Sequence, residues 1–293
     1  MPHGGRVMGE RLDWIREERQ GSVVPGGGTA PRLTEAGIRS RLRTAGDWAG
    51  FTLLDVTDST NRRAMEMAEN GAPHGTVVVA DAQTAGRGRL GRGWVSPPGR
   101  NLYVSLLLRP ALSPAEGARL SLVAGVALAD AVEGMGVPGS LKWPNDLYLG
   151  DRKAAGILAE MASDVVRVRH VVIGAGINVN MLPGDFPPVI SGKATSLRIR
   201  SGRPFSREEL LARFLDAFAD RYGEFLDGGF AALHEGWDRR DFLRGRRVRL
   251  RRGRGEEWGT AEGVDPEGAL RFLPDGAAAA EPVQSGEILE YGR

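Results

Sequence analysis

The sequence predicts an α+β fold in which one large domain is followed by a small β-barrel. Up to about residue 240, strand-like apolar runs alternate with helices that carry clear capping signals. After Asp241 the pattern changes to short strand candidates separated by glycine and proline turns. The chain of 293 residues is long enough for two such units, and its hydrophobic share of 41% is ample for a core.

The predicted elements follow in a clear order. Residues 1–31 contain glycine and proline clusters and no sustained apolar period, which predicts a largely disordered extension with one short helix over residues 10–19. Residues 32–240 form the first predicted domain. Its elements are a helix over 33–43, a strand over 51–56, a helix from Asp58 to Asn70, strands over 76–80 and 101–108, a helix from the capping box at Ser113 to Gly134, strands over 141–149, 154–161 and 165–173, and a helix that opens at Ser206.

Residues 241–293 form the second predicted domain. Strand candidates lie at 248–251, 257–262, 270–273 and 287–291, between glycine and proline turns. About five short strands in so few residues are typical of a small barrel.

Composition excludes several classes of protein. The net charge is only +2, which argues against a protein that coats nucleic acid along its whole surface. No apolar run approaches the length of about 18 residues that a membrane span needs, and the first 20 residues lack the apolar stretch of a secretory signal. The chain has no cysteine, so disulfide and thiol chemistry are excluded. We therefore expect a cytoplasmic protein with no membrane partner.

The most informative segment is residues 83–94, which hold four glycines and three arginines directly after the apolar run 76–80. Glycines this dense allow the backbone to fold over a ligand, and arginines bind carboxylate or phosphate. A solvated basic loop or a nucleic-acid tail is the alternative for such a run. Because this run is short, single and framed by regular structure, we favour an anion-binding loop that becomes ordered around its ligand.

A second motif is Lys142-Trp143-Pro144-Asn145-Asp146. One interpretation is a simple hairpin bend with a solvated Lys142; the other is that Asn145 and Asp146 direct oxygens at a ribose, a phosphate or a metal ion. Lysine occurs only at Lys142, Lys153 and Lys193 in a chain that otherwise uses arginine. Lys153 precedes Ala154-Ala155-Gly156, whose small side chains allow a ligand to approach closely.

A third motif, Gly174-Ala175-Gly176-Ile177-Asn178, follows an apolar strand. It lacks the third glycine and the following helix of a dinucleotide fingerprint, so a turn beside a ligand is the better interpretation. The four histidines are dispersed and have no metal-binding spacing. Ser59 has no histidine or aspartate at an interpretable distance, so we expect it to cap a helix rather than to act as a nucleophile.

Together these motifs resemble those of the biotin–protein ligases, also called biotin–[acetyl-CoA-carboxylase] ligases. The resemblance covers about residues 33–293, and the motifs stand in the family's order. It implies a catalytic domain built around a mixed β-sheet with helices, of the class II synthetase-like type, followed by an SH3-like barrel. It also implies that biotin is joined to ATP to give biotinyl-5′-adenylate and pyrophosphate, and is then transferred to a lysine of a biotin carboxyl carrier protein or domain.

The resemblance also implies roles for individual residues. The polar contacts to the ureido ring of biotin would come from Ser59, Thr60, Asn61 and Gln83. The loop that closes over biotin and the phosphates would include Arg87, Gly88 and Arg89, and Lys153 would hold the biotin carboxylate; Lys153, Arg87 and Arg89 are the implied catalytic residues. The ATP side would comprise Arg89, Arg92, Trp94 (against adenine), Asn145, Asp146, Ile177 and Asn178.

This chemistry is consistent with the residues. A carboxylate and an α-phosphate are both anions, and cations must offset their repulsion before they join. We expect Mg²⁺ to accompany ATP and to assist the leaving pyrophosphate. An ordered loop would then keep water from the reactive anhydride.

Two departures from the family pattern carry expectations of their own. Fewer than 35 residues precede the common region, whereas many members carry an N-terminal DNA-binding domain, so we expect no DNA-repressor function. Tyr291 stands where some members have an arginine, which leaves a barrel contact to ATP open. Homodimer formation also stays open, because an edge strand suits either the carrier or a second copy.

Two rival functions follow from the same residues. A lipoate–protein ligase shares the chemistry, although the loop of residues 83–94 and the Lys-Trp-Pro-Asn-Asp motif favour biotin. A nucleic-acid or adaptor module is suggested by the arginines of residues 244–254, for which a solvated strand face is the simpler interpretation.

Overall fold

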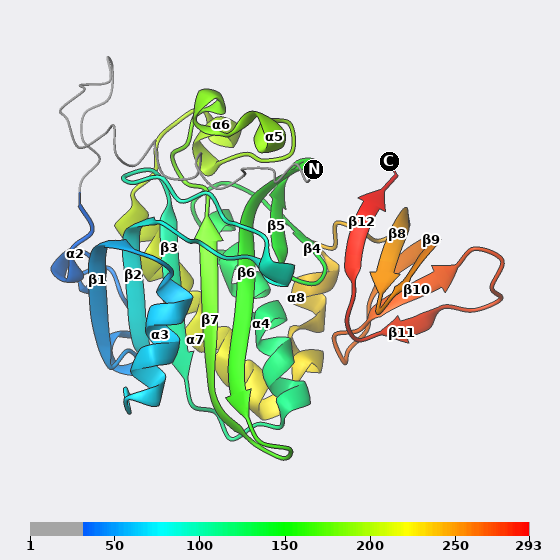
Figure 1. Ribbon diagram of the computed structural model, residues 1–293, viewed down its shortest axis with the longest axis horizontal. Helices are drawn as coiled ribbons and strands as arrows, with labels where there is room; N and C mark the ends of the chain where they lie inside the picture. Colours follow the sequence, from blue (N-terminus) through cyan, green and yellow to red (C-terminus); the bar gives the residue numbers. More distant parts are fainter. Residues whose placement is uncertain (1–31, 293) are drawn as a thin grey trace, which may run out of the picture.

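The computed structural model describes residues 32–292 and contains two β-sheets (Figure 1). The predictions for residues 1–31 lie outside this range. The large sheet has seven strands in the order β1-β2-β3-β7-β6-β5-β4; β1 and β2 are parallel and the other neighbours are antiparallel, so the sheet is mixed. Its strands are β1 (Gly50–Thr57), β2 (Thr76–Gln83), β3 (Leu102–Leu108), β4 (Ser140–Lys142), β5 (Asp146–Leu149), β6 (Arg152–Ser163) and β7 (Val168–Ile177).

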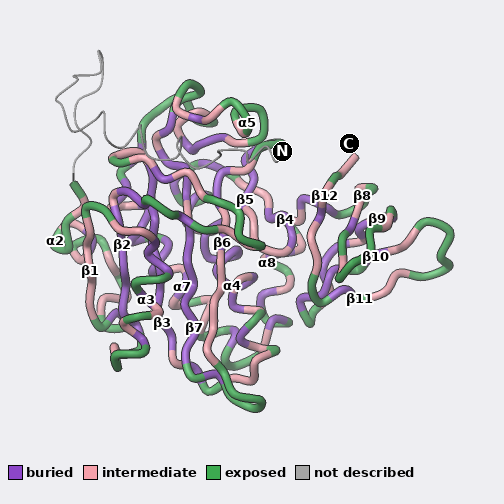
Figure 2. Tube along the Cα trace, viewed as in Figure 1, coloured by how far each residue is buried: buried purple, intermediate pink, exposed green. Residues whose placement is uncertain are grey.

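Helices cover both faces of this sheet (Figure 1). In β2, alternate side chains point to opposite faces, so Val77 and Val79 join the core under α4 while Val78 joins the smaller core under α3. Figure 2 shows the buried residues concentrated in the central strands. The helices are α2 (Glu35–Arg39), α3 (Thr60–Glu69), α4 (Pro114–Glu133), α5 (Pro188–Ser191), α6 (Leu197–Ser201), α7 (Arg207–Gly228) and α8 (His234–Asp238), with short 3₁₀ turns at η1 (Ala45–Asp47), η2 (Arg89–Gly91), η3 (Pro183–Asp185) and η4 (Phe230–Leu233).

The small sheet contains five antiparallel strands in the order β11-β10-β9-β8-β12 and fits an SH3-like domain. Four of the five arginines of β8, at positions 247, 249, 251 and 252, are paired with carboxylates; Arg251, for example, lies 2.7 Å from Glu256 and Arg252 lies 2.6 Å from Glu257. Pairing of this kind supports the strand-face interpretation of the arginine cluster over a nucleic-acid surface. The strands are β8 (Arg246–Arg252), β9 (Gly255–Val264), β10 (Leu270–Pro274), β11 (Glu281–Val283) and β12 (Glu287–Tyr291).

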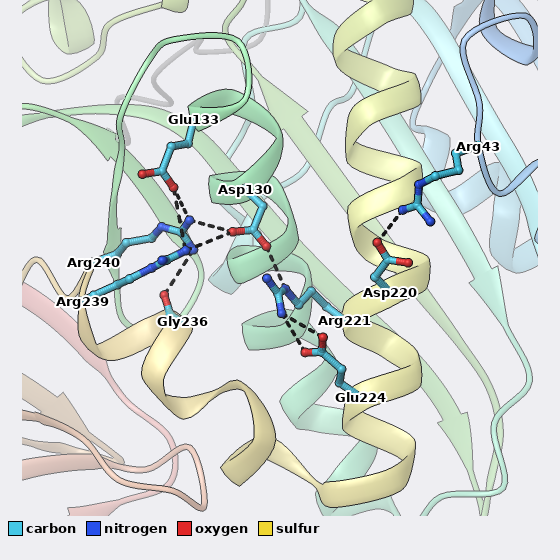
Figure 3. Close-up of polar contacts among 9 residues, drawn as sticks. All are labelled: Arg43, Asp130, Glu133, Asp220, Arg221, Glu224, Gly236, Arg239 and Arg240. Atoms are coloured by element: carbon cyan, nitrogen blue, oxygen red, sulfur yellow. Dashed lines mark hydrogen bonds and ion pairs between the residues drawn. The ribbon is translucent and has the colours of Figure 1, made fainter.

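A polar network joins α4, α7 and the segment after α8 behind the large sheet (Figure 3). Asp130 of α4 accepts hydrogen bonds from Arg221 at 2.8 Å and from Arg240 at 2.6 Å. The Arg240 side chain is only 6% exposed, and Glu133 is its second carboxylate partner. Because a buried guanidinium needs paired acceptors, this network fixes the chain just before it enters the barrel.

The predicted fold class and most predicted elements are confirmed, with four differences. The turn expected at residues 174–178 is wrong, because residues 174–177 belong to strand β7 and pair with β3 and β6. The prediction of one continuous strand over 141–149 is wrong. This segment forms two antiparallel strands, β4 and β5, which are separated by a bend with a cis Trp143–Pro144 peptide. The helix expected over 33–43 is shorter, since α2 ends at Arg39. The sequence analysis missed β11, α5, α6 and α8, because elements of three to five residues are too short to show a period. Within residues 32–292, no helix has the length and apolarity needed to cross a bilayer.

Candidate active site

The predicted motifs meet where the N-terminus of α3, the end of β2 and the neighbouring strands β6 and β7 come together. Residues 84–95, called here the arginine loop, run from the end of β2 across β6 and β7 towards the barrel (Figure 1). Three glycines of the two strands, Gly156, Gly174 and Gly176, lie beneath these elements and are called here the glycine floor.

The glycine floor allows side chains of neighbouring elements to pack closely against the strands. A Cβ atom on Gly174 would lie 1.9 Å from Asn61 Oδ1, and one on Gly176 would lie 2.4 Å from Trp94 Nε1. At Gly156 a Cβ would lie 3.1 Å from Lys153 Nζ. Side chains from α3 and from the arginine loop therefore rest directly on the strand backbone, which no other residue type allows.

Four buried polar side chains form a hydrogen-bonded cluster, called here the ring pocket after the role proposed for it below: Thr60, Asn61, Gln83 and Ser105. The backbone N–H of Thr60 donates to Gln83 Oε1 at 2.9 Å, and Ser105 Oγ donates to Asn61 Oδ1 at 2.6 Å. All four side chains are less than 10% exposed. Ser59 caps α3 by accepting from the Arg62 N–H, which supports its predicted capping role.

The three arginines of the arginine loop have three different partners. Arg87 donates to both carboxylate oxygens of Glu160 at 2.9 Å, and Arg92 pairs with Glu287 of β12 at 2.8 Å. Arg89 donates only to the Asn145 side chain at 3.4 Å and to the Gly286 carbonyl at 3.2 Å. Within residues 32–292 no carboxylate lies within ion-pair distance of Arg89, and burial lowers its pKa. Among the described residues, Arg89 is therefore a desolvated cation that has no directly paired carboxylate, and Asp146 and Glu287 act on it only through longer-range electrostatics.

Lys153 lies between Asp146 and Trp94. Its Nζ atom is 2.6 Å from Asp146 Oδ1 and 5.4 Å from the centroid of the Trp94 ring. The Trp94 Nε1 atom is buried and has no hydrogen-bond partner among the described residues. An unpaired buried donor costs about 1–3 kcal/mol, so hydrogen bonds hold the Trp94 backbone but not its ring.

The Lys142-to-Asp146 motif forms a hairpin bend that also carries site residues. Asn145 fixes the bend, because its side chain donates to the Ile157 carbonyl at 2.6 Å while its own carbonyl accepts from the Ile157 N–H at 2.9 Å. Of the two interpretations of this motif, the solvated Lys142 does not hold: the residue is 7% exposed, and Nζ lies 5.9 Å from the Tyr148 ring centroid and 5.6 Å from that of Tyr291. Burial lowers the pKa of Lys142 to about 8.

Two residues predicted on the nucleotide side have buried side chains. Ile177 has no exposed surface, and Asn178 is 5% exposed. The Asn178 amide donates to the Thr195 carbonyl at 3.0 Å, and its Oδ1 accepts from Asn101 at 3.4 Å. Any nucleotide contact from these two side chains would need a rearrangement of that packing.

Comparisons with known proteins agree with this geometry. Residues 53–178 match the Biotin/lipoate A/B protein ligase family. The bifunctional ligase/repressor BirA of Bacillus subtilis is 40% identical over 240 residues, which are 82% of this chain and 74% of that protein. The chain belongs to the biotin protein ligase family. Another family member, the biotin–[acetyl-CoA-carboxylase] ligase of Paracoccus denitrificans, is 35% identical over 82% of this chain and 100% of that protein.

A solved biotin protein ligase has the same fold. The structure from Aquifex aeolicus, in complex with biotin and ATP, superimposes with a TM-score of 0.71 at 32% identity and covers 84% of this chain and 100% of that chain. Family membership confirms the resemblance that the motifs indicated. The roles predicted for single residues of this biotin protein ligase stay predictions.

The sequence analysis missed three residues that contact the predicted site residues: Glu160, Ser105 and Glu287. Glu160 is the only acidic residue of β6, and Ser105 is the only hydrogen-bonding side chain besides Tyr103 in the apolar strand β3. Such isolated polar residues in apolar strands are a usable signal, because a buried polar group needs a partner. Glu287 gives no comparable signal, since its contact with Arg92 depends on how the barrel docks.

The buried Lys142 predicts a specific pH dependence of stability. Its pKa of about 8 lies below the ordinary value of 10.5, so the folded protein releases the proton first. Stability is therefore reduced below pH 8, where folded and unfolded chains both carry the charge, and it recovers as the pH rises towards 10.5. Relative to Lys142→Met, the wild type should gain about 1–3 kcal/mol of unfolding free energy across this window.

Urea unfolding at several pH values measures this difference. The exposed Lys193 provides the control, because Lys193→Met should show no such trend relative to wild type. A constant difference between wild type and Lys142→Met from pH 7 to 10.5 would contradict a lowered pKa in the folded state.

Proposed function

We propose that this protein joins biotin to ATP, forming biotinyl-5′-adenylate and pyrophosphate, and then transfers biotin to a lysine of a carboxylase carrier domain. The observation that carries the proposal is the placing of two cations, Arg89 and Lys153, beside a buried polar pocket over the glycine floor. Its relatives named biotin–[acetyl-CoA-carboxylase] ligase and the Aquifex aeolicus complex with biotin and ATP support it.

The site divides into regions by chemistry. We assign the ureido ring to the ring pocket, with Ser59 at the start of α3 beside it. We assign the biotin carboxylate to Lys153 and the α-phosphate to Arg89. The remaining predicted residues, Arg92, Trp94, Asn145 and Asp146, are assigned to the nucleotide, with Trp94 against adenine.

In the first step the biotin carboxylate attacks the α-phosphorus and pyrophosphate leaves. Lys153 holds the carboxylate and Arg89 the phosphate, so their charges offset the repulsion between the two reacting anions. Asp146 Oδ1 lies 2.6 Å from Lys153 Nζ and forms an ion pair with it. We infer that Lys153 keeps this partner until a substrate carboxylate replaces it, which leaves Asp146 free to accept hydrogen bonds from the nucleotide.

In the second step the neutral ε-amine of the carrier lysine attacks the acyl carbon, an amide bond forms and AMP leaves. The acyl-adenylate is also open to attack by water until then. The arginine loop lies over β6 and β7 and is fixed at Arg87 and Arg92, which supports a role in excluding water from the anhydride. We therefore assign the arginine loop to retention of the intermediate.

Mg²⁺ enters this proposal as part of the MgATP substrate. Residues 32–292 contain no group of three histidine, aspartate or glutamate side chains that could hold a metal ion. Mg²⁺ commonly binds through substrate phosphates and waters with few protein carboxylates, and Asp146 is the carboxylate present at this site. Because the reaction consumes ATP, we place it in the cytoplasm.

The ring pocket favours biotin over lipoate. A ureido ring offers two N–H donors and one carbonyl acceptor, which suit the hydroxyl and amide groups of Thr60, Asn61 and Gln83. The dithiolane ring of lipoate has no such groups, so it would gain no hydrogen bond from these side chains, and a site built to bind a polar ring discriminates against an analogue that lacks it. Biotin should therefore support ATP–pyrophosphate exchange and labelling of a purified carrier domain, whereas lipoate should support neither at equal concentration. Equal rates with both acids would contradict the assignment of the ring pocket.

Lys153→Ala should keep the fold and lower adenylate formation by at least about a hundredfold, as expected when a charge that stabilises the transition state is removed. The Lys153 side chain is a third exposed, and its backbone is held by the Lys193 carbonyl at 2.9 Å, so the variant should fold. Biotin-dependent ATP–pyrophosphate exchange measures the rate. Lys193→Ala is the matched control, and wild-type exchange by Lys153→Ala would remove Lys153 from the mechanism.

Arg89→Ala should release reactive adenylate into solution, because it removes a phosphate contact and the bonds of the arginine loop to Asn145 and Gly286. Release is measured as labelling of an added bystander protein, with free lysine as a quencher. Arg119→Ala, on the outer side of α4, is the control. A release rate equal to wild type would argue against a role of Arg89 in retaining the intermediate.

A further inference from the structure

Glu160 contacts two site residues that come from different parts of the chain. Its Oε2 accepts from the Asn61 amide of α3 at 2.8 Å, and both of its oxygens accept from Arg87 of the arginine loop at 2.9 Å. The reaction proposed above gives Glu160 no task. A carboxylate is nevertheless the side chain that suits this position, because it accepts from an amide and a guanidinium together.

The contact with Glu160 sets the orientation of the Asn61 amide. Asn61 Nδ2 donates to Glu160 and to the Leu158 carbonyl at 3.1 Å, so its Oδ1 faces Ser105 and Gly174. If the amide turned over, two oxygen acceptors would face an oxygen. Glu160 therefore fixes which atom of Asn61 faces the ring pocket.

A chain of hydrogen bonds continues from this point to the far end of the arginine loop. Asn61 contacts Ser105, and Thr60 lies 2.9 Å from Ser105 and bonds to Gln83. Gln83 Nε2 donates to Ser96 at 3.0 Å, and Ser96 donates to the Trp94 carbonyl at 3.0 Å. The two ends of the arginine loop, Arg87 and Trp94, are thus connected through the residues that line the ring pocket.

We propose that Glu160 is a positioning residue that couples the ring pocket to the arginine loop. This inference rests on the proposed function, since it takes the ring pocket as the biotin site. Glu160 orders Asn61 for the ureido ring and at the same time holds Arg87, so that a ligand that stabilises Asn61 also stabilises the closed loop. With Arg87 neutralised by Glu160, the phosphate is left to Arg89.

The ion pair between Arg87 and Glu160 can hold the arginine loop locally without contributing much to the stability of the whole fold. The side chains of Arg87 and Glu160 are 39% and 28% exposed, and ion pairs with this exposure contribute little to global stability. Glu160→Gln should therefore fold normally. The glutamine keeps an acceptor for Asn61 but lacks the charge that holds Arg87. The variant therefore tests the contact with Arg87 separately from the contact with Asn61.

Limited trypsin cleavage reports directly on the arginine loop, since Arg87, Arg89 and Arg92 are all cleavage sites. Without ligand, Glu160→Gln should be cut after Arg89 and Arg92 about fivefold to tenfold faster than wild type, as the loss of one charge-assisted hydrogen bond predicts. Its dissociation constant for biotin, measured by calorimetry, should rise by a similar factor, whereas KM for ATP should change less. Glu66→Gln on α3, which removes an exposed pair with Arg63, is the control.

A double-mutant cycle distinguishes coupling from a general structural effect. In an Arg87→Gln background, Glu160→Gln should change biotin affinity and cleavage after Arg89 much less than it does in wild type, because the contact is already absent. Equal effects in both backgrounds, or no effect of Glu160→Gln in wild type, would overturn the inference. Failure of the wild type to bind biotin at all would instead overturn the proposed function.

Discussion

The absence of side chains at Gly156, Gly174 and Gly176 of β6 and β7 determines how α3 and the arginine loop are arranged around the sheet. Because these residues have no Cβ, Asn61 and the Trp94 ring rest directly on the sheet. This close approach brings α3 and the arginine loop to one patch, although they are separated in the chain by β2. Side chains at these positions would push both away, and the ring pocket and the two cations would no longer share one site.

The electrostatics of the site follow from how its cations are partnered. Arg87 and Arg92 have carboxylate partners on opposite sides, and Lys153 has Asp146. Arg89 is desolvated and contacts only neutral oxygens. A desolvated cation without a directly paired carboxylate binds an anion favourably. Arg87 and Arg92 therefore hold the arginine loop, while Arg89 stays available to bind an anion.

Local signals in the sequence were sufficient for the fold and for much of the site. The capping box at Ser113 acts within a few residues, so it predicted α4 correctly. The glycines at 174 and 176 were read as a turn and lie in strand β7, because the pairing of β7 with β3 and β6 is not visible locally. A solvated Lys142 was one of two open interpretations, and the residue is buried against Tyr148 and against Tyr291, which lies more than a hundred residues later. Glu160 stands out as the only acidic residue of β6, but the sequence does not show that its partners come from α3 and the arginine loop. Contacts between distant segments leave no periodic pattern to read.

The contact between the arginine loop and the barrel has a consequence for local unfolding. Arg89 and Gly286 are 197 residues apart in the sequence, and Glu287 divides its carboxylate between Arg92 of the arginine loop and Arg251 of β8. Proteins open locally in cooperative units of different stability. A transient opening of β12 would remove the contacts of Arg89 and Arg92 with the barrel, while Arg87 stays paired with Glu160 of β6. The rate at which the site is uncovered is therefore set partly by the stability of a domain that holds none of the ring-pocket residues.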